Sequence, residues 1–425
     1  MEKMMQYVWQ HRLWPTRGLS TTDGRSLRII DPGQLNTGAG PDFFNAEIEL
    51  DSEHWVGNIE IHYRASDWMR HGHHHDRAYD SVILHVVEKD DMNIPRPGTE
   101  SHIPQVTMPH AEDIYRRYLA MVGAPPTDIT CRDILADISS LYAADWLATL
   151  GFERVYAKSD RVLEMARQLD NDWEEVAYIT LARAMGFGVN NDAFERLARS
   201  LPLKILRKHA NSQQGVEALL FGQASLLRSV DGTPDAYMDA LATEYRFLAH
   251  KYSLTPIDER CWKLGRMRPY NFPHRRIATL AHLLLYTPRL LSALKGVRSE
   301  KDARCLFDLN LEGYWSHHHR FGSDESPMSR AISADSCRLL IINVIVPLIH
   351  AWATFSGEER TAAEVVEVLQ SLPPERNSIV TAFTAAGIEC PDALSSQALI
   401  QLRREYCERR KCIYCRFGHR LLAKG

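Results

Sequence analysis

Two carboxylates and a histidine near the N-terminus have the residue types and spacing of a metal site. Asp42 follows a glycine–proline turn at the start of one extended run, and Glu60 and His62 lie in a second extended run about eighteen residues later. Side chains alternate along a strand, so Glu60, His62 and Arg64 share one face. A hairpin joining the two runs brings Asp42 beside Glu60, and two converging carboxylates make a hard oxygen site for Mg²⁺ or Mn²⁺.

His62 and Arg64 add two further functional groups to this face. An imidazole titrates near neutral pH and can act as a general base, and a guanidinium carries a permanent positive charge. The alternative is an ordinary exposed strand, in which Asp42 caps a turn and Glu60 and His62 face the solvent.

A run of histidines follows the second extended run. His71, His73, His74 and His75 are interrupted by a single glycine, and neutral imidazoles bind Zn²⁺, Mn²⁺ or Fe²⁺. On a helix, His71 and His75 would be four residues apart and share a face. The sequence therefore offers His71, His73 and His75 as metal ligands, with a solvated polar turn as the alternative. A His-liganded centre would require three of the following histidines to point at one position: His62, His71, His73, His74, His75 and His85.

Short extended runs separated by turn residues are expected to hold these side chains. The first fourteen residues have a helical pattern with Met5, Val8, Trp9 and Leu13 as the apolar stripe. Extended runs follow, and a loop of prolines and a glycine lies at residues 95–98. The predicted strands are Ser26–Ile30, Phe43–Leu50, Trp55–Tyr63 and Ser81–Val87.

From residue 133 the pattern changes to long helical runs, with glycines and prolines mostly between them. Pro347 is the exception, and it is expected to kink or split its run. The chain is therefore predicted as α+β, with a compact α/β domain at residues 1–125 and a larger, mainly α-helical domain at residues 126–425. The predicted helical runs are Ala143–Ala166, Asp172–Met185, Asp192–Leu201, Gly215–Leu227, Ala236–Tyr252, Arg276–Leu294, Cys337–Phe355 and Ala362–Leu372.

The N-terminal domain resembles the PD-(D/E)xK phosphodiesterase superfamily. There a Pro-Asp pair at one strand is followed by Glu-x-Lys on the next, and the matching residues here are Pro41-Asp42 and Glu60-x-His62. The resemblance implies metal-assisted hydrolysis of a phosphodiester, with Asp42 and Glu60 holding the ion. His62 stands where the superfamily has lysine, a departure that a degenerate site would also show.

The resemblance extends to the elements around these residues. It implies a helix over about Asp67–Asp80, ahead of the strand at Ser81–Val87. Some members carry Gln-x-x-x-Tyr on this helix, and the chain has His75 and Tyr79 at that spacing. Members often have an acidic residue on the preceding helix, a supporting part that Glu2 would play.

Several longer strings resemble a bacterial family catalogued as a domain of unknown function. They are GPDFFNAEIEL and GNIEIHYRASDW in the N-terminal domain, RMRPYNFPHRRIA at residues 266–278, and SQALIQLRREYCERRKCIYCRFG at residues 396–418. This resemblance covers nearly the whole chain. It implies no activity, so the functional expectation rests on the motifs.

Three cysteines near the C-terminus form a candidate second metal site. Cys407, Cys412 and Cys415 have the spacing C-x4-C-x2-C, which structural zinc and iron–sulfur sites both use together with a fourth ligand. The candidates for that ligand are Cys131, Cys390 and His419. Some PD-(D/E)xK exonucleases hold an iron–sulfur cluster with three clustered C-terminal cysteines and a distant one, and this resemblance favours Cys131. The alternative is three reduced cysteines, some of them buried.

The stretch between residues 263 and 276 is basic, lacks acidic residues and has aromatic residues among the basic ones. Such a pattern suits a phosphate backbone and stacked bases. The alternative is a structural loop that packs between helices. The candidate nucleic-acid-binding residues are Lys263, Arg266, Arg268, Arg275 and Arg276.

Charge and composition narrow the class of protein. Residues 1–110 contain 10 basic and 16 acidic residues, a net charge near −6, and 10 of the 19 histidines. This asymmetry is compatible with a metal site there and an anionic partner elsewhere. Eight cysteines in 425 residues do not indicate a disulfide scaffold. No secretory signal and no window of about 18 apolar residues is recognised, so a cytoplasmic protein outside membranes is expected, with its oligomeric state left open.

Three functions remain in competition. The first, which we adopt as the expectation, is a metal-dependent, nuclease-like phosphodiesterase acting on DNA or RNA. The second is a non-catalytic nucleic-acid-binding or scaffold protein with a degenerate nuclease site. The third is a hydrolase that holds Zn²⁺ or Fe²⁺ with histidines.

Overall fold

The computed structural model describes residues 1–14, 18–108, 111–123, 129–229, 232–265, 271–323 and 331–423, without the side chains of residues 111 and 112. The protein is α+β, with about 56% helix and 11% strand, and a sheet at the N-terminus precedes a helical region. The chain divides into two compact units. The N-terminal unit consists of Met1–Ile138, Ala385–Gly387 and Leu402–Gly425, and the helical unit of Ser139–Thr384 and Ile388–Gln401.

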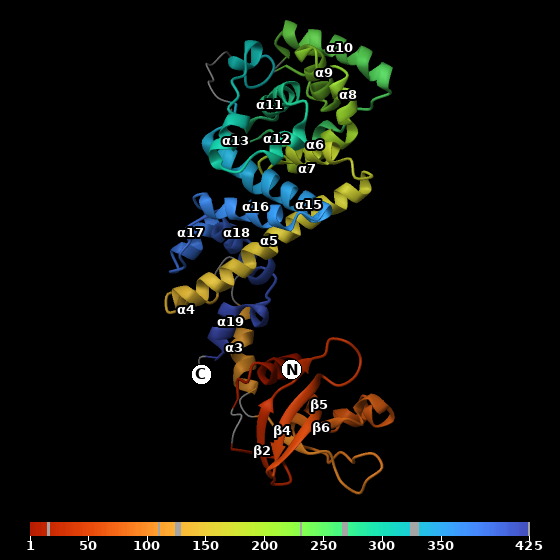
Figure 1. The fold of residues 1–425 in the computed structure, drawn as a ribbon, viewed down its shortest axis with the longest axis vertical. Helices are drawn as coiled ribbons and strands as arrows, with labels where there is room; N and C mark the ends of the chain where they lie inside the picture. The colour runs from red at the N-terminus through yellow and green to blue at the C-terminus, as the bar shows by residue number, and fades with distance from the viewer. Residues whose placement is uncertain are drawn as a thin grey trace. The chain divides into compact units, whose positions relative to one another are not determined.

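The N-terminal unit contains a mixed sheet in the order β1-β2-β4-β5-β6-β7, with β3 paired to β4 (Figure 1). Neighbouring strands from β1 to β5 are antiparallel, whereas β5, β6 and β7 are parallel. The four longer strands match the four predicted ones. The strands are β1 (Leu19–Ser20), β2 (Ser26–Asp31), β3 (Gln34–Leu35), β4 (Phe43–Leu50), β5 (Glu53–Arg64), β6 (Val82–Lys89) and β7 (Gln105–Thr107).

Close approach of β5 and β6 depends on Gly57. A Cβ atom at this position would lie 2.3 Å from Ile83 Cγ2 and 2.8 Å from the Ser81 carbonyl oxygen, so a larger residue would push the strands apart. Parallel pairing of β5 with β6 then places Glu60 opposite His85 and His62 opposite Val87. The site residues of β5 and β6 therefore share one part of the sheet.

The predicted helix over Asp67–Asp80 is wrong. The chain instead forms α2 (Asp67–Arg70) and two short 3₁₀ helices, η1 (His73–His75) and η2 (Arg77–Tyr79). Gly72 separates α2 from η1 with φ = +76°, a left-handed conformation that glycine adopts without steric cost. The break cancels the i, i+4 relation between His71 and His75.

The C-terminal segment packs in the N-terminal unit. Helix α19 (Arg416–Ala423) places Leu422 in the same apolar core as Met5 and Trp9 of α1 (Glu2–Gln10). Helices α3 (Ala111–Gly123) and α4 (Arg132–Leu135) also belong to this unit. The predicted division between residues 125 and 126 therefore differs from the structural one. A linker predicted from two prolines does not reveal that the C-terminal segment Leu402–Gly425 packs back into the N-terminal unit.

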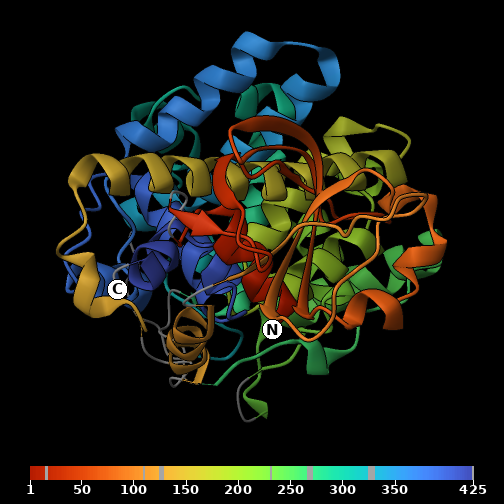
Figure 2. The same cartoon turned by 90° about the horizontal axis from the view of Figure 1, so that it is seen from below.

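The helical unit has one large apolar core. Its longest helix, α5, runs beside α18 and α15 of the same unit (Figure 2). The predicted run Arg276–Leu294 is two helices, because Pro288 separates α11 from α12. The helices are α5 (Ser140–Gln168), α6 (Trp173–Ala184), α7 (Asn191–Ser200), α8 (Leu203–Arg207), α9 (Gln213–Gln223), α10 (Ala236–Tyr252), α11 (Pro273–Tyr286), α12 (Leu290–Lys295), α13 (Glu300–Phe307), α14 (Ala334–Leu340), α15 (Val346–Ser356), α16 (Glu359–Ser371), α17 (Ser378–Thr384) and α18 (Ala393–Gln401).

Pro347 does not break its run. A π-helical segment, Ile341–Ile345, joins α14 to α15 directly ahead of the proline, and the wider turn accommodates the missing amide. The continuous run Ala334–Ser356 is long and apolar enough to cross a membrane, so the expectation that no such window exists is wrong. However, 67% of that window is buried inside the structure, as in the core helix of a soluble protein.

Candidate metal centre

Three histidines of the N-terminal unit converge. His62 comes from β5, His71 follows α2, and His73 opens η1. Their ligand nitrogens all lie within 4.8 Å of one another, the only such group of three among the described residues. Since Gly72 redirects the chain between His71 and His73, the two imidazoles approach β5 from different directions.

Glu60 adds a carboxylate to the three imidazoles. Its Oε1 lies 3.4 Å from His62 Nε2 and 3.3 Å from His73 Nε2. His73 Nε2 is buried and makes no hydrogen bond of proper geometry, despite this short distance. The other oxygen, Oε2, accepts the backbone N–H of Asp42 at 3.0 Å, which leaves Oε1 directed at the histidines.

Asp42 is fixed at the mouth of β4 beside Glu60. Its Oδ2 accepts the Ile61 N–H at 3.0 Å, and its Oδ1 accepts the Gln6 side-chain amide at 2.7 Å. Burial, and then the negative charge of Glu60, raise the pKa of Asp42 to about 7. Glu2 on α1 raises the pKa further through its charge. Two carboxylates held together in a buried site make a region that favours a cation.

A chain of hydrogen bonds fixes the tautomer of His62. The Gln105 amide nitrogen donates to Asp90 and to the Met92 carbonyl, so its Oε1 accepts from His85 Nδ1 at 3.0 Å. The other nitrogen of His85, Nε2, is then an acceptor for His62 Nδ1–H at 2.9 Å. By this assignment His62 Nε2 carries a lone pair inside the cluster, the state that a metal ligand requires.

Burial keeps these imidazoles neutral. Desolvation, followed by the effects of His85, His73 and His71, lowers the pKa of His62 to about 2. Burial likewise lowers the pKa of His85 to about 4. Neutral imidazoles at physiological pH suit metal binding, whereas His62 cannot supply the positive charge of a lysine.

Tyr79 and Arg70 border the cluster. Tyr79 stacks on His73 with ring centroids 3.9 Å apart, and burial raises the pKa of its hydroxyl to about 12. Arg70 is paired with Asp67 at 2.9 Å, is 68% exposed, and lowers the pKa of His62 through its charge. It is therefore a cation at the rim of the centre.

Two predicted site residues lie apart from this cluster. Arg64 is half-exposed and lies 3.6 Å from Asp91. His75 is exposed and packs its ring against His74 at 3.8 Å. The structure therefore brings Asp42, Glu60 and His62 together with His71 and His73. Arg64 and His75 lie outside this cluster.

Sequence reasoning missed Gln6, Arg70 and Gln105. Gln6 lies four residues after Glu2 on α1, a spacing that signals a shared helix face. Arg70 immediately precedes the histidine run. Gln105 had no sequence signal, because only the parallel pairing of β6 with β7 places it opposite His85.

The four candidate cysteines all belong to the N-terminal unit. Cys131 precedes α4, Cys407 ends the π-helical segment Leu402–Cys407, and Cys412 and Cys415 flank η9 (Cys412–Tyr414). None of the four forms a disulfide. Cys390 lies in the helical unit.

The basic stretch is only partly suited to contact with nucleic acid. Lys263 is exposed, whereas Arg266 and Arg268 lie outside the described residues. Arg275 and Arg276 are 0% and 4% exposed, and they donate to the carbonyl oxygens of Trp315 and Ala331. The expected contact of these two arginines with a phosphate backbone does not fit this burial, because α11 begins at Pro273 and carries both into the core.

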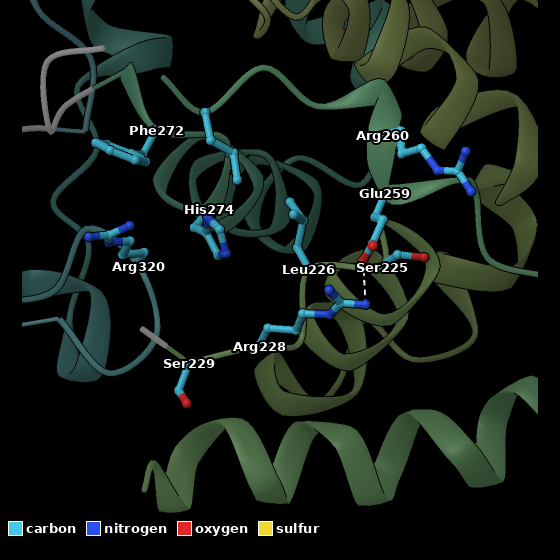
Figure 3. A pocket seen from close by; sticks show the side chains of 10 residues that line it. Ser225, Leu226, Arg228, Ser229, Glu259, Arg260, Phe272, His274 and Arg320 are labelled. Atoms are coloured by element: carbon cyan, nitrogen blue, oxygen red, sulfur yellow. Dashed lines mark ion pairs between the residues drawn. The ribbon is translucent and has the colours of Figure 1, made fainter. Parts of the chain in front are cut away.

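A cavity of about 370 Å³ lies beside this stretch in the helical unit (Figure 3). Arg228, Arg320 and His274 are among its lining residues, and Figure 3 shows Arg228 paired with Glu259. Burial lowers the pKa of His274 to about 4, so its imidazole is neutral. The volume is that of a small-molecule site.

Fold and site together define a two-unit α+β protein whose N-terminal unit gathers imidazoles and carboxylates in one largely buried centre. The chain belongs to the family described as Protein of unknown function (DUF2851), which matches residues 2–378. No curated protein and no solved structure matches the chain. Since the family description assigns no activity, the functional argument rests on the geometry of the centre.

Proposed function

We propose that this protein is a metal-dependent phosphodiesterase whose ion is held by histidines together with Glu60, next to Asp42. The observation that carries the proposal is the convergence of His62, His71 and His73 within 4.8 Å. Glu60 Oε1 lies within 3.4 Å of two of these imidazoles. Within this set His62 Nε2 is hydrogen-bonded to His71 Nδ1 at 3.1 Å, whereas His73 Nε2 is buried without a hydrogen bond. Nitrogen and carboxylate donors gathered in this way favour a cation.

The donor types favour Mn²⁺, Fe²⁺ or Zn²⁺ over Mg²⁺. Magnesium prefers oxygen ligands and retains its waters, while imidazole suits the transition metals. Mn²⁺ accepts both imidazole nitrogen and carboxylate oxygen. Of Mg²⁺ and Mn²⁺, the two ions expected for the carboxylate pair, we therefore retain Mn²⁺. Zn²⁺ and Fe²⁺ are the ions of the competing His-liganded reading.

The order of elements supports a phosphodiester as the substrate. Helix α1, the antiparallel strands β2, β4 and β5, and the parallel strand β6 follow the order implied by the PD-(D/E)xK resemblance. In place of the implied helix between β5 and β6, the chain has the four-residue α2 and two 3₁₀ helices. Asp42 precedes β4, and Glu60 lies on β5, as that resemblance requires. His62, which stands in place of the lysine, fits the role of a metal ligand rather than that of a positive charge. Arg70 at the rim would supply the positive charge that contacts the phosphate.

Each residue then has a role in hydrolysis. A bound ion would supply hydroxide near neutral pH and polarise a phosphoryl oxygen. Glu60 and the three histidines would hold it, and Gln105 with His85 keeps Nε2 of His62 unprotonated. Asp42, whose pKa is raised to about 7, would accept the proton of the attacking water.

The test uses the full chain, freed of metal by a chelator and reloaded with Mn²⁺, Zn²⁺ or Mg²⁺. Substrates are bis(p-nitrophenyl) phosphate and single- and double-stranded DNA and RNA. We expect hydrolysis with Mn²⁺ and a loss of at least about 100-fold in kcat/KM for Glu60→Gln, since removing a ligand removes the ion's position. The matched control is His74→Gln, which changes an exposed histidine outside the cluster.

Two results would contradict the proposal at different points. If His73→Gln and His74→Gln bind Mn²⁺ as the wild type does, the centre itself is wrong. If Mn²⁺ binds at the centre and nucleic acid binds without being cut, the protein is the non-catalytic alternative.

A further inference from the structure

The four cysteines of the N-terminal unit are brought together from distant parts of the sequence. Cys131 precedes α4, while Cys407, Cys412 and Cys415 lie within the C-terminal segment. Both views show α4 beside this blue C-terminal segment (Figures 1 and 2). Cys415 is 6% exposed, and the other three are partly buried.

The four thiols are near enough to interact electrostatically. Burial raises the pKa of Cys131, and the next contributions come from Cys415, Cys407 and Cys412 in that order. Burial and then Cys415 raise the pKa of Cys407 to about 12. Such interactions weaken steeply with distance and solvent screening, so the four sulfurs occupy one neighbourhood.

The backbone around the three C-terminal cysteines forms a compact loop. Arg410 N–H donates to the Cys407 carbonyl at 3.2 Å, and Cys415 N–H donates to the Cys412 carbonyl at 3.2 Å. Gly418 is needed here, because a Cβ atom at that position would lie 2.2 Å from the Cys412 carbonyl oxygen. The loop thus turns its cysteines together without any disulfide among the described cysteines.

The other candidates for a fourth ligand are engaged elsewhere. Cys390 belongs to the helical unit, where burial and then Asp392 raise its pKa. His419 Nδ1 is hydrogen-bonded to the Tyr7 hydroxyl at 2.8 Å. Cys131 is therefore the partner that the fold selects for the C-terminal triplet.

We propose that Cys131, Cys407, Cys412 and Cys415 form a four-thiolate centre that holds an iron–sulfur cluster. Four thiols gathered in one largely buried place, with no disulfide among them, form the ligand set of such a cluster. On binding, each thiol loses its proton to solvent and becomes a thiolate. The centre ties α4 to the C-terminal segment, and it is separate from the histidine centre of the proposed function.

The spacing of the sulfurs argues for a cluster over a single zinc ion. In a tetrahedral zinc site the sulfurs stand roughly 3.8 Å apart, because each Zn–S bond is about 2.3 Å long. No three of these thiols lie within 4.8 Å of one another, since the histidine group alone meets that limit among the described residues. A cluster of several irons and sulfides spans the wider opening.

The test is the metal content of the full chain, expressed with iron and purified without oxygen. We expect visible charge-transfer absorption and about four irons and four sulfides per chain for a [4Fe–4S] cluster, or about two of each for a [2Fe–2S] cluster. Cys131→Ser should lower bound iron at least fivefold, whereas the matched control Cys390→Ser should leave it unchanged. Mn²⁺ binding at the histidine centre should persist in both variants.

A labelling experiment on the wild-type chain avoids variants that fail to fold. In the iron-loaded protein, iodoacetamide should spare the four cysteines and modify the exposed Cys305. Removing iron should increase the labelling of the three partly buried cysteines, Cys131, Cys407 and Cys412. The proposal is overturned if the four react like Cys305 in loaded protein. It is also overturned if Cys131→Ser retains full iron, or if all four hold a single zinc with no sulfide.

Discussion

A buried carboxylate lies in each unit of the molecule, and the two have opposite surroundings. Glu217 of α9 is 1% exposed and accepts hydrogen bonds from Gln213, Tyr237 and Trp315 at 2.8, 2.9 and 2.7 Å. Glu60 of β5 is 4% exposed, and its Oε2 accepts the Asp42 N–H, but its Oε1 lies near two imidazoles, of which His73 makes no hydrogen bond through Nε2. The first carboxylate has side-chain donors for both oxygens, whereas the second lies beside the carboxylate of Asp42 and has a backbone donor for Oε2 alone.

The difference separates structure from function. A buried polar group surrounded by complementary donors stabilises the fold or is neutral to it, and removing it leaves those donors unsatisfied. A buried group surrounded by acceptors and like charges costs stability until a cation arrives. Glu217 is therefore expected to serve packing and Glu60 to serve a ligand.

The largest effect is expected for Glu217→Ala. The change leaves three donors without their acceptor in the core of the helical unit, which costs about 3 kcal/mol or more of unfolding free energy. Urea denaturation of wild type and variant measures the loss. Glu217→Gln, which keeps the shape and one acceptor oxygen, should cost less. Equal losses in the two variants would mean that the carboxylate itself, rather than side-chain volume or a single acceptor oxygen, is what this position requires.

Glu60→Gln should behave in the opposite way. Removing the charge relieves its repulsion with Asp42, so the metal-free variant should be at least as stable as the wild type. Affinity for Mn²⁺, measured by calorimetry, should fall at least about 100-fold, because a ligand is lost. A variant that loses stability but keeps its Mn²⁺ affinity would place Glu60 with Glu217 as a structural group.

A smaller effect is expected for Gln105→Leu, which cuts the hydrogen-bond chain behind His62. Without the Gln105 acceptor, His85 is no longer held in one tautomer, and His62 Nε2 is protonated part of the time. Loss of an outer-shell partner typically weakens metal affinity by about 10-fold to 100-fold. Calorimetric titration with Mn²⁺ checks this; unchanged affinity would show that His62 selects its tautomer without the chain.

Local patterns in the sequence predicted the elements of both units but not all of their contacts. Alternation in residues 43–50 and 55–63 predicted β4 and β5, and with them the approach of Asp42 to Glu60. The i, i+4 relation of His71 and His75 was wrong because it assumed a helix that Gly72 interrupts. Burial of Arg275 and Arg276 was missed for a different reason: composition marks a basic stretch, but only the packing of α11 decides which side faces the core.

The smallest effect concerns the pH dependence of Asp42→Asn in the metal-free protein. The folded pKa of Asp42, about 7, lies above its unfolded value of 3.8, so the folded state binds more protons between these values. Stability from this carboxyl is therefore present at low pH and is lost as pH rises from about 4 to 7. Asp42→Asn removes the cost of ionisation, so it should gain about 1 kcal/mol relative to wild type at pH 8 and little at pH 4. Urea denaturation at both pH values measures the difference. A gain of equal size at both pH values would mean that the ionised carboxyl of Asp42 carries no strain, and that the contrast between the two buried carboxylates does not extend to the neighbour of Glu60.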